Sequence, residues 1–190
     1  MADTSLEDSS PRSAFVHQTG LAIVMPEAES RFGALRQKFD PQAGVGVPAH
    51  ITILFPFMPP ELVDASVRRR LMILFKRFSP FRCVLAGVGR FPSTAYLAPV
   101  FPEPIVELTR AVSRAFPDYP PYGGAHESIV PHLTVANGDA AEADFVEREL
   151  RADLQRNGPV ATHCSRVKLL ENSSGRWREA HEFALVGHQG

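Results

Sequence analysis

Two short segments of the sequence carry the same pair of polar side chains. The segment AHITILFPF places His50 and Thr52 in an otherwise apolar run, and PHLTVANG places His132 and Thr134 in a similar run. Side chains alternate between the two faces of a β-strand, so each His and Thr pair would share one face. The opposite face of each strand would carry apolar side chains that can join a core.

Two histidines and two threonines on facing strands would suit chemistry at a phosphodiester. An imidazole with a pKa of about 6.5 can take a proton from an attacking water or hydroxyl, and a second imidazole can protonate the leaving oxygen. The threonine hydroxyls can donate hydrogen bonds to phosphate oxygens and stabilise the charge of the transition state. This hypothesis requires that the two polar faces meet across a gap the size of one phosphate group.

A structural role for these histidines is the first alternative. One His-x-Thr motif in a strand is more often a hydrogen-bonded part of a core, but two copies in equivalent positions favour a functional role. Metal binding is the second alternative, and it would need further ligands. The sequence has neither H-x-H nor H-E-x-x-H spacing, and His126, His163 and His181 would join a site only by accident of folding. We therefore expect catalysis without a metal or cofactor.

The remaining sequence predicts the elements that hold these motifs. Apolar periodicity, prolines and glycines predict the order strand, helix, His-x-Thr strand, helix, strand, followed by the same five elements and a closing strand. The expected strands cover residues 15–26, 44–57, 81–91, 94–100, 132–136, 160–171 and 176–187, and the expected helices cover residues 27–40, 61–78, 103–116 and 140–156. Such a repeat indicates an internal duplication.

The duplicated order predicts an α+β fold with two lobes. Each lobe would be a small, mostly antiparallel sheet backed by helices, and a central cleft would run between the lobes. The chain would form one bilobal domain over residues 15–190, with repeat halves at about 15–91 and 92–187 and a disordered leader at residues 1–14. We expect Cys83 and Cys164, which are separated by nearly the same offset as the two motifs, to be buried free thiols.

Composition narrows the class of partner. The 190 residues are 44% hydrophobic, which is enough for a sizeable core. The sequence contains 20 Lys and Arg residues and 21 Asp and Glu residues, which gives a net charge of −1. Such a chain has no overall field for polyanions, so phosphate recognition would be local and no long nucleic-acid footprint is expected. No apolar run could span a membrane and no secretory signal is recognisable, so we expect a cytoplasmic monomer without a membrane partner.

The paired motifs resemble those of the 2H phosphoesterase superfamily, and in particular its 2'-5' RNA ligase-like branch. That superfamily is named for two H-x-[S/T]-hydrophobic motifs, which the sequence matches as HITI from His50 and as HLTV from His132. The segments VGRFP and PPYGG are also similar to bacterial members, and the resemblance covers residues from about 15 to 187. It implies metal-free hydrolysis or reversible formation of phosphodiesters at ribose 2' oxygens, including the opening of 2',3'-cyclic phosphates.

The resemblance also implies a role for each motif residue. His50 and His132 would be the acid and the base, in an order that the sequence leaves open, and Thr52 and Thr134 would hold the phosphate. The expected function is a phosphoesterase that acts on 2',3'-cyclic phosphate or 2'-5' linkages of an RNA end or a small cyclic nucleotide. The alternatives are a 2'-5' RNA ligase, which would join a 2',3'-cyclic phosphate end to a 5'-hydroxyl, and a non-catalytic module that binds an RNA end.

Three further residues are candidates for substrate binding. Tyr122 lies in a Pro- and Gly-rich segment at residues 117–131, which leads into the second motif and is longer than a simple connection requires. It would stack on a base, and a packed surface loop is the alternative. Trp177 follows a turn at residues 172–175, and we expect Arg166 across the ladder from it, which would combine a stacking face with a cation. A lone tryptophan is also a common core residue.

Overall fold

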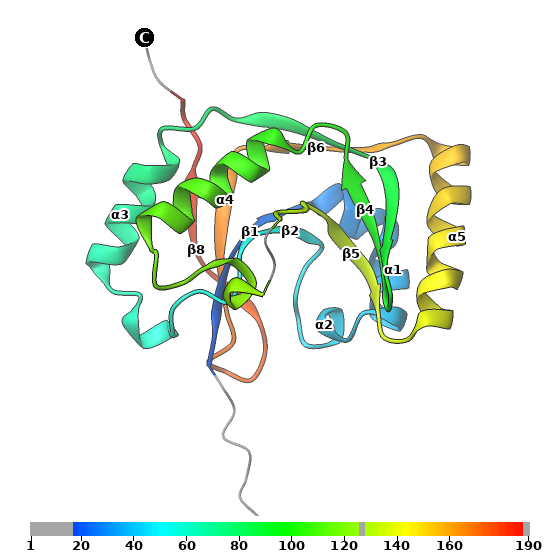
Figure 1. Ribbon diagram of the computed structural model, residues 1–190, viewed down its shortest axis with the longest axis horizontal. Helices are drawn as coiled ribbons and strands as arrows, with labels where there is room; N and C mark the ends of the chain where they lie inside the picture. Colours follow the sequence, from blue (N-terminus) through cyan, green and yellow to red (C-terminus); the bar gives the residue numbers. More distant parts are fainter. Residues whose placement is uncertain (1–16, 126–127, 188–190) are drawn as a thin grey trace, which may run out of the picture.

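The computed structural model describes residues 17–125 and 128–187, which fold into two sheets and the helices that cover them (Figure 1). In the first sheet the strand order is β2-β1-β7-β8, and in the second sheet it is β5-β4-β3-β6. All neighbouring strands in these sheets are antiparallel. The strands are β1 (Thr19–Val24), β2 (His50–Leu54), β3 (Phe81–Phe91), β4 (Thr94–Pro99), β5 (Leu133–Asn137), β6 (Val160–Cys164), β7 (Arg166–Glu171) and β8 (Arg178–Ala184). The leader expected at residues 1–14 lies outside the described residues.

Helices pack against each sheet. α1 and α5 contact the second sheet, whereas α3 and α4 contact the first (Figure 1). The helices are α1 (Pro26–Phe39), α2 (Pro41–Gly44), α3 (Ala65–Phe75), α4 (Glu103–Ala115) and α5 (Ala140–Asn157), with the 3-10 helices η1 (Pro60–Leu62) and η2 (Pro121–Gly124). This arrangement confirms the expected α+β fold with two antiparallel sheets backed by helices. Among the described residues, no helix combines the length and the apolar character needed to cross a bilayer.

Local interactions make two elements shorter than the sequence predicts. The carboxylate of Asp64 accepts a hydrogen bond from the N–H of Val67, so α3 begins after this cap and not at residue 61. The strand expected over residues 44–57 begins only at His50, because α2 and a turn occupy the preceding segment. The motif therefore stands at the very start of its strand.

The two sheets each place a motif strand at one edge, and each sheet draws strands from distant parts of the sequence. The motif strands β2 and β5 are each at the edge of their own sheet and lie beside β1 and β4, respectively. β3 follows the first motif in the sequence yet belongs to the second sheet, while β7 and β8 complete the first sheet. Each sheet therefore contains strands from both halves of the chain, whose exact boundaries stay a prediction.

The single strand expected at residues 160–171 is wrong, because the chain changes sheets within it. β6 ends at Cys164 beside β3, and β7 begins at Arg166 beside β1. Buried side chains occupy alternate positions up to Cys164 and then shift by one position, to Val167 and Leu169. Since the side chains of one strand keep a strict alternation, this shift marks the boundary between two strands.

One hydrophobic core joins the two lobes. Buried residues from both sheets and from α1, α3, α4 and α5 form a single cluster. Cys83 and Cys164 lie in this core as buried free thiols, as expected. A second, small cluster of buried residues lies next to the first motif and consists of Ala22, Val47 and Leu170.

Candidate functional site

The first motif lies on β2, at the edge of the first sheet. Ile51 and Ile53 are buried in the core, with 0% and 1% of their surface exposed. His50 and Thr52 alternate with them and are half-buried. In the ladder with β1, Thr52 lies opposite Ala22. The alternation expected from the sequence is confirmed for this strand.

The second motif has a similar arrangement at the edge of the second sheet, with His132 immediately before β5 and Thr134 within it. Leu133 and Val135 are fully buried, whereas His132 and Thr134 are half-buried. Thr134 lies opposite Tyr96 of β4. Both motifs therefore present an imidazole and a hydroxyl on the face of the strand that is turned away from the core.

The two motif strands converge although they belong to different sheets. β2 and β5 are in contact, and His132 is close enough for its positive charge to lower the pKa of His50. The two motif strands are therefore neighbours, which the phosphodiester hypothesis requires. Within residues 17–125 and 128–187, no cluster of three or more His, Cys, Asp or Glu side chains is arranged to hold a metal ion.

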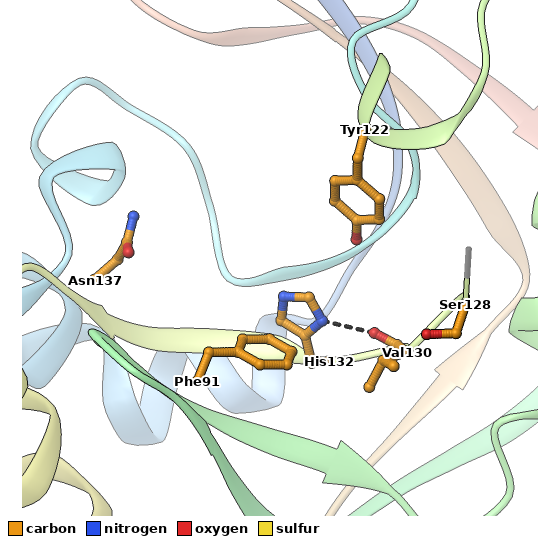
Figure 2. A pocket seen from close by; sticks show the side chains of 6 residues that line it. All are labelled: Phe91, Tyr122, Ser128, Val130, His132 and Asn137. Carbon is orange, nitrogen blue, oxygen red and sulfur yellow. Dashed lines mark hydrogen bonds between the residues drawn. The ribbon is translucent and has the colours of Figure 1, made fainter. Parts of the chain in front are cut away.

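A backbone carbonyl two residues earlier in the chain orients each motif histidine. His50 Nδ1 lies 2.8 Å from the carbonyl oxygen of Pro48, and His132 Nδ1 lies 2.7 Å from that of Val130 (Figure 2). A carbonyl oxygen only accepts, so Nδ1 carries the hydrogen in both rings. Nε2 of each neutral ring can therefore accept a proton, and Nε2 of each protonated ring can donate one.

Burial lowers the pKa of both motif histidines. For His50, burial is the largest effect, and its carbonyl partner acts against it by raising the pKa. The cation of Arg36 lowers the pKa of His50 further, whereas the carboxylate of Asp40 raises it. For His132, burial lowers the pKa, and only the carbonyl partner acts against it. Both imidazoles are therefore neutral more readily than histidine in water.

A small apolar cavity lies beside the first motif. Its volume is about 120 Å³. It is lined by His50 and Thr52 of the first motif and by Gly20, Ala22, Val47, Phe55, Leu170 and Trp177, among others. The N–H of Trp177 donates to the carbonyl oxygen of Val45 at 2.9 Å, and its ring centroid lies 5.9 Å from that of Phe55. The structure therefore places the predicted residue Trp177 beside the first motif, partly packed against the small apolar cluster.

A larger cavity, of about 470 Å³, lies beside the second motif. It is lined by Phe91, Tyr122, Ser128, Val130, His132 and Asn137 (Figure 2). The ring centroid of His132 lies 5.3 Å from that of Phe91 and 5.1 Å from that of Tyr96. Among the described residues that line this cavity, aromatic rings rather than charged groups thus flank the second histidine.

Tyr122 links the two motif regions. Its backbone N–H donates to the carbonyl oxygen of Phe55 at 2.7 Å, just after β2. Its side chain lines the cavity beside His132, with the hydroxyl directed toward that imidazole (Figure 2). Burial raises the pKa of the Tyr122 phenol, so the hydroxyl stays protonated and can donate a hydrogen bond. The backbone φ of Tyr122 is 53°, in the left-handed region, which is costly for a residue with a side chain.

Arg166 lies away from Trp177. It is paired with Ala184 in the ladder between β7 and β8, whereas Trp177 lies near the turn at the other end of that hairpin. Its guanidinium forms an ion pair of 2.6 Å with Glu182 and lines a separate groove beside α3. The expected placement of Arg166 across the ladder from Trp177 is wrong, because the register of the hairpin sets them apart.

A buried ion network behind the first motif is absent from the expectations based on sequence. Arg36 of α1 is only 1% exposed, and its guanidinium lies 2.8 Å from the carboxylates of both Glu29 and Asp40. It also donates to the carbonyl oxygen of Val47 at 3.1 Å, and Glu29 accepts a hydrogen bond of 2.5 Å from the N–H of Ala49. These bonds fix the backbone immediately before the first motif.

One feature of the sequence could have indicated this network. Arg36 lies on the buried stripe of α1, four residues after Phe32 and three residues before Phe39. A charged side chain on an apolar stripe needs buried partners of opposite charge. Glu29 and Asp40 lie seven residues before and four residues after it, close to the same side of the helix.

Comparisons with known proteins give the family of the chain. A sequence model described as "2'-5' RNA ligase superfamily" matches residues 24–176. A Bacillus cereus (strain G9842) protein named "Putative phosphoesterase" is 27% identical over 165 residues, which cover 83% of this chain and 90% of the relative.

Solved structures share the fold. TT0787 of Thermus thermophilus is similar with a TM-score of 0.59 and 19% identity, over 90% of this chain and 100% of that chain. LigT of E. coli, complexed with 3'-AMP, is similar with a TM-score of 0.54 and 19% identity, over 89% of this chain and 98% of that chain. The two-lobed architecture is thus shared over nearly the whole length.

The family match covers most of the chain and includes both segments in which the His-x-Thr motifs lie. Family and relatives together support an activity of the phosphoesterase or RNA ligase type. The resemblance read from the paired motifs is therefore confirmed at the level of the family, and the chain belongs to the 2'-5' RNA ligase superfamily of 2H phosphoesterases.

Proposed function

We propose that the two motifs on the neighbouring strands β2 and β5 together open 2',3'-cyclic phosphates, or cleave 2'-5' phosphodiesters, at an RNA end or in a small nucleotide, without a metal. One observation carries this proposal. Two histidines on strands in contact each have Nδ1 bonded to a backbone carbonyl, which leaves both Nε2 atoms for proton transfer. His50 and His132 would be the acid and the base, and Thr52 and Thr134 would hold the phosphate.

The reaction would proceed by in-line attack at phosphorus. Nε2 of the neutral histidine takes a proton from water while the water oxygen bonds to phosphorus, and the protonated histidine gives its Nε2 proton to the ribose oxygen whose bond to phosphorus breaks. The product is a phosphomonoester, and exchange with solvent restores the two protonation states. The threonine hydroxyls donate to the non-bridging oxygens, where negative charge accumulates.

Relatives and lining residues support a nucleotide as substrate. LigT of E. coli has been crystallised with NADP+, with 3'-AMP, with phosphate and with ATP. In the present chain, Trp177 lines the cavity beside the first motif and Tyr122 the cavity beside the second. An aromatic side chain on either side of the phosphate position could stack on a base.

A panel of substrates in the presence of EDTA tests this proposal. The panel contains 2',3'-cyclic mononucleotides, an oligonucleotide with a cyclic phosphate end and a 2'-5' linked dinucleotide, with products separated by chromatography. We expect turnover of at least one substrate, and its loss in a folded His50→Ala, His132→Ala double variant. Turnover by the double variant at the wild-type rate would exclude the proposed site, and loss of wild-type turnover on adding EDTA would exclude the metal-free mechanism.

RNA ligation is the second candidate, and the description of the matching family favours it. It uses the same groups, with a 5'-hydroxyl in place of water as the attacking group. Because water is present in large excess, hydrolysis prevails unless the cleft excludes water from the phosphate. Adding an oligonucleotide with a 5'-hydroxyl to the panel separates the two reactions, since only ligation gives a longer product with a 2'-5' linkage.

A further inference from the structure

The cavity beside His132 adjoins a second groove along α4. This groove has a volume of about 300 Å³, and its lining shares Tyr122 and Ser128 with the larger cavity. It is lined further by Arg110, Ser113, Arg114, Pro121 and Ile129. A ligand bound at the second motif could therefore extend past Tyr122 onto the surface of α4.

Two arginines give this groove a positive charge. Arg110 and Arg114 are both exposed and lie one helical turn apart on α4. In the part of the chain that the structure describes, no carboxylate forms an ion pair with either of them. The hydroxyl of Ser113 donates to the carbonyl oxygen of Thr109 at 2.8 Å, and the two guanidinium groups are the charged donors among the residues that line the groove.

Helix stability does not account for this pair of arginines. A cation in the last turn stabilises a helix through its dipole, which accounts for Arg114 but not for Arg110, one turn earlier. Like charges one turn apart also repel each other. Six other arginines among the described residues form ion pairs with carboxylates: Arg31, Arg36, Arg90, Arg151, Arg166 and Arg178. The α4 pair is distinguished by its place, because it lines a groove that shares Tyr122 and Ser128 with the cavity beside His132.

We propose that Arg110 and Arg114 bind the phosphate on the 5' side of the nucleotide that carries the cyclic phosphate, so that the preferred substrate is the end of an oligonucleotide. This inference rests on the proposed function and names its substrate class. Guanidinium groups recognise phosphate through paired N–H bonds. Tyr122, whose side chain lines both cavities, would lie alongside the nucleotide between the two phosphates. A footprint of two phosphates agrees with a chain whose net charge is −1.

The test compares three substrates that each carry a terminal 2',3'-cyclic phosphate. They are adenosine 2',3'-cyclic phosphate, the same nucleotide with an added 5'-phosphate, and a dinucleotide. We expect the dinucleotide and the 5'-phosphorylated form to be preferred. Arg110→Gln and Arg114→Gln should each lower kcat/KM for these two about tenfold, mainly through KM, and leave the unphosphorylated mononucleotide unchanged. The matched control is Arg148→Gln, an exposed arginine on α5, which should change none of the three.

Several results would overturn the inference. Equal losses on all three substrates would mean that the arginines act through the fold or through His132. Unchanged kinetics on all three, or a 5'-phosphorylated form that behaves like the unphosphorylated one, would mean that the groove binds no phosphate.

Absence of turnover by the wild type would instead contradict the proposed function. Measurements of ligand binding would then test separately whether Arg110 and Arg114 bind a phosphate. Calorimetry would compare a dinucleotide 3'-phosphate with 3'-AMP. The inference stands if the dinucleotide binds more tightly and the Arg110→Gln, Arg114→Gln double variant removes the difference. It falls if the two ligands bind alike or if the double variant keeps the difference.

Discussion

The two motif regions share their backbone arrangement but differ in what surrounds them. Each has a His-x-Thr strand at a sheet edge and a bond from Nδ1 to a carbonyl two residues earlier. The network of Arg36 lies behind His50, next to an apolar cavity of about 120 Å³. Phe91 and Tyr96 flank His132, next to a cavity of about 470 Å³ that adjoins the groove along α4.

The same pair of side chains therefore lies in two different environments, which under the proposed function would hold two ends of one substrate. The two motifs present the same imidazole and hydroxyl, and the packing around each motif gives it a separate environment. The first region is held by buried ion pairs and has little room, whereas the second has the space for the bulk of a nucleotide. We therefore expect changes at the two motifs to have similar effects on proton transfer and unequal effects on the surrounding structure.

Replacing either histidine should have the largest effect. His50→Gln and His132→Gln should each reduce kcat by about 10²–10⁴, because each removes one of the two proton transfers. Steady-state kinetics on the best substrate of the panel measures the loss, and circular dichroism controls for folding. A variant that keeps the wild-type kcat would show that the replaced histidine transfers no proton in the reaction. The two motifs would then not contribute alike to catalysis.

Replacing Arg36 should affect the first region alone. In Arg36→Met, Glu29 and Asp40 lose their buried partner, and we expect a loss of about 3–5 kcal/mol in the free energy of unfolding. The pKa of His50 should rise, because Arg36 lowers it, while the pKa of His132 should not move. Urea unfolding and NMR titration of the imidazole Cε1–H signals measure the two effects.

Arg36→Lys is the control for this prediction. It keeps the positive charge but loses the planar fork that reaches two carboxylates, so stability should fall while the pKa of His50 stays low. Equal shifts of both histidines in Arg36→Met would contradict a network that serves only the first motif.

The sequence predicts the faces of the two motif strands because alternation is a local property. His50 and His132 lie on polar faces wherever the strands are placed, and the family resemblance rests on the same residues. Which groups pack around each motif depends instead on contacts distant in the sequence. Trp177 reaches the first motif through a backbone bond to Val45, a pairing that no local pattern encodes.

The errors have the same origin. At Ser165 the alternation of apolar residues in the sequence shifts by one position. This shift can be recognised as a strand boundary only once β7 is known to pair with β1. The position of Arg166 follows from the register of a hairpin that also contains an irregularity between Leu169 and Leu170. The sequence shows that Arg36 is a charged residue on the apolar stripe of α1. Only the folded structure shows which backbone segment Arg36 and its partners hold in place.

Removing the motif hydroxyls should have an intermediate effect. Thr52→Val and Thr134→Val keep the side-chain shape and remove one hydrogen bond each to a charged phosphate, which corresponds to a loss of about tenfold or more in kcat/KM. The two losses should be similar, because each hydroxyl occupies the same place on its strand. Thr→Ser at either position retains the hydroxyl and should recover most of the activity. A full loss in Thr→Ser would assign the effect to packing and not to phosphate binding.

The smallest effect, a shift in the pH profile, would separate the roles of the two histidines. Because one ring must be neutral and the other protonated, kcat/KM should follow a bell-shaped curve with two apparent pKa values. Burial lowers the pKa of both rings, so the maximum should lie below a pH of about 6.5, the value for free histidine. The profile of the wild type alone does not tell which limb belongs to which ring.

Asp40→Asn would assign the limbs. The carboxylate of Asp40 stabilises protonated His50, so its removal should lower the pKa of His50 and shift one limb to lower pH. A shift of the acidic limb would make His50 the base, and a shift of the basic limb would make it the acid. Asp153→Asn, whose carboxylate pairs with Arg31 elsewhere, should move neither limb. If both limbs moved equally in Asp40→Asn, the charge would act on both rings, and the electrostatic separation of the two motif regions would be wrong.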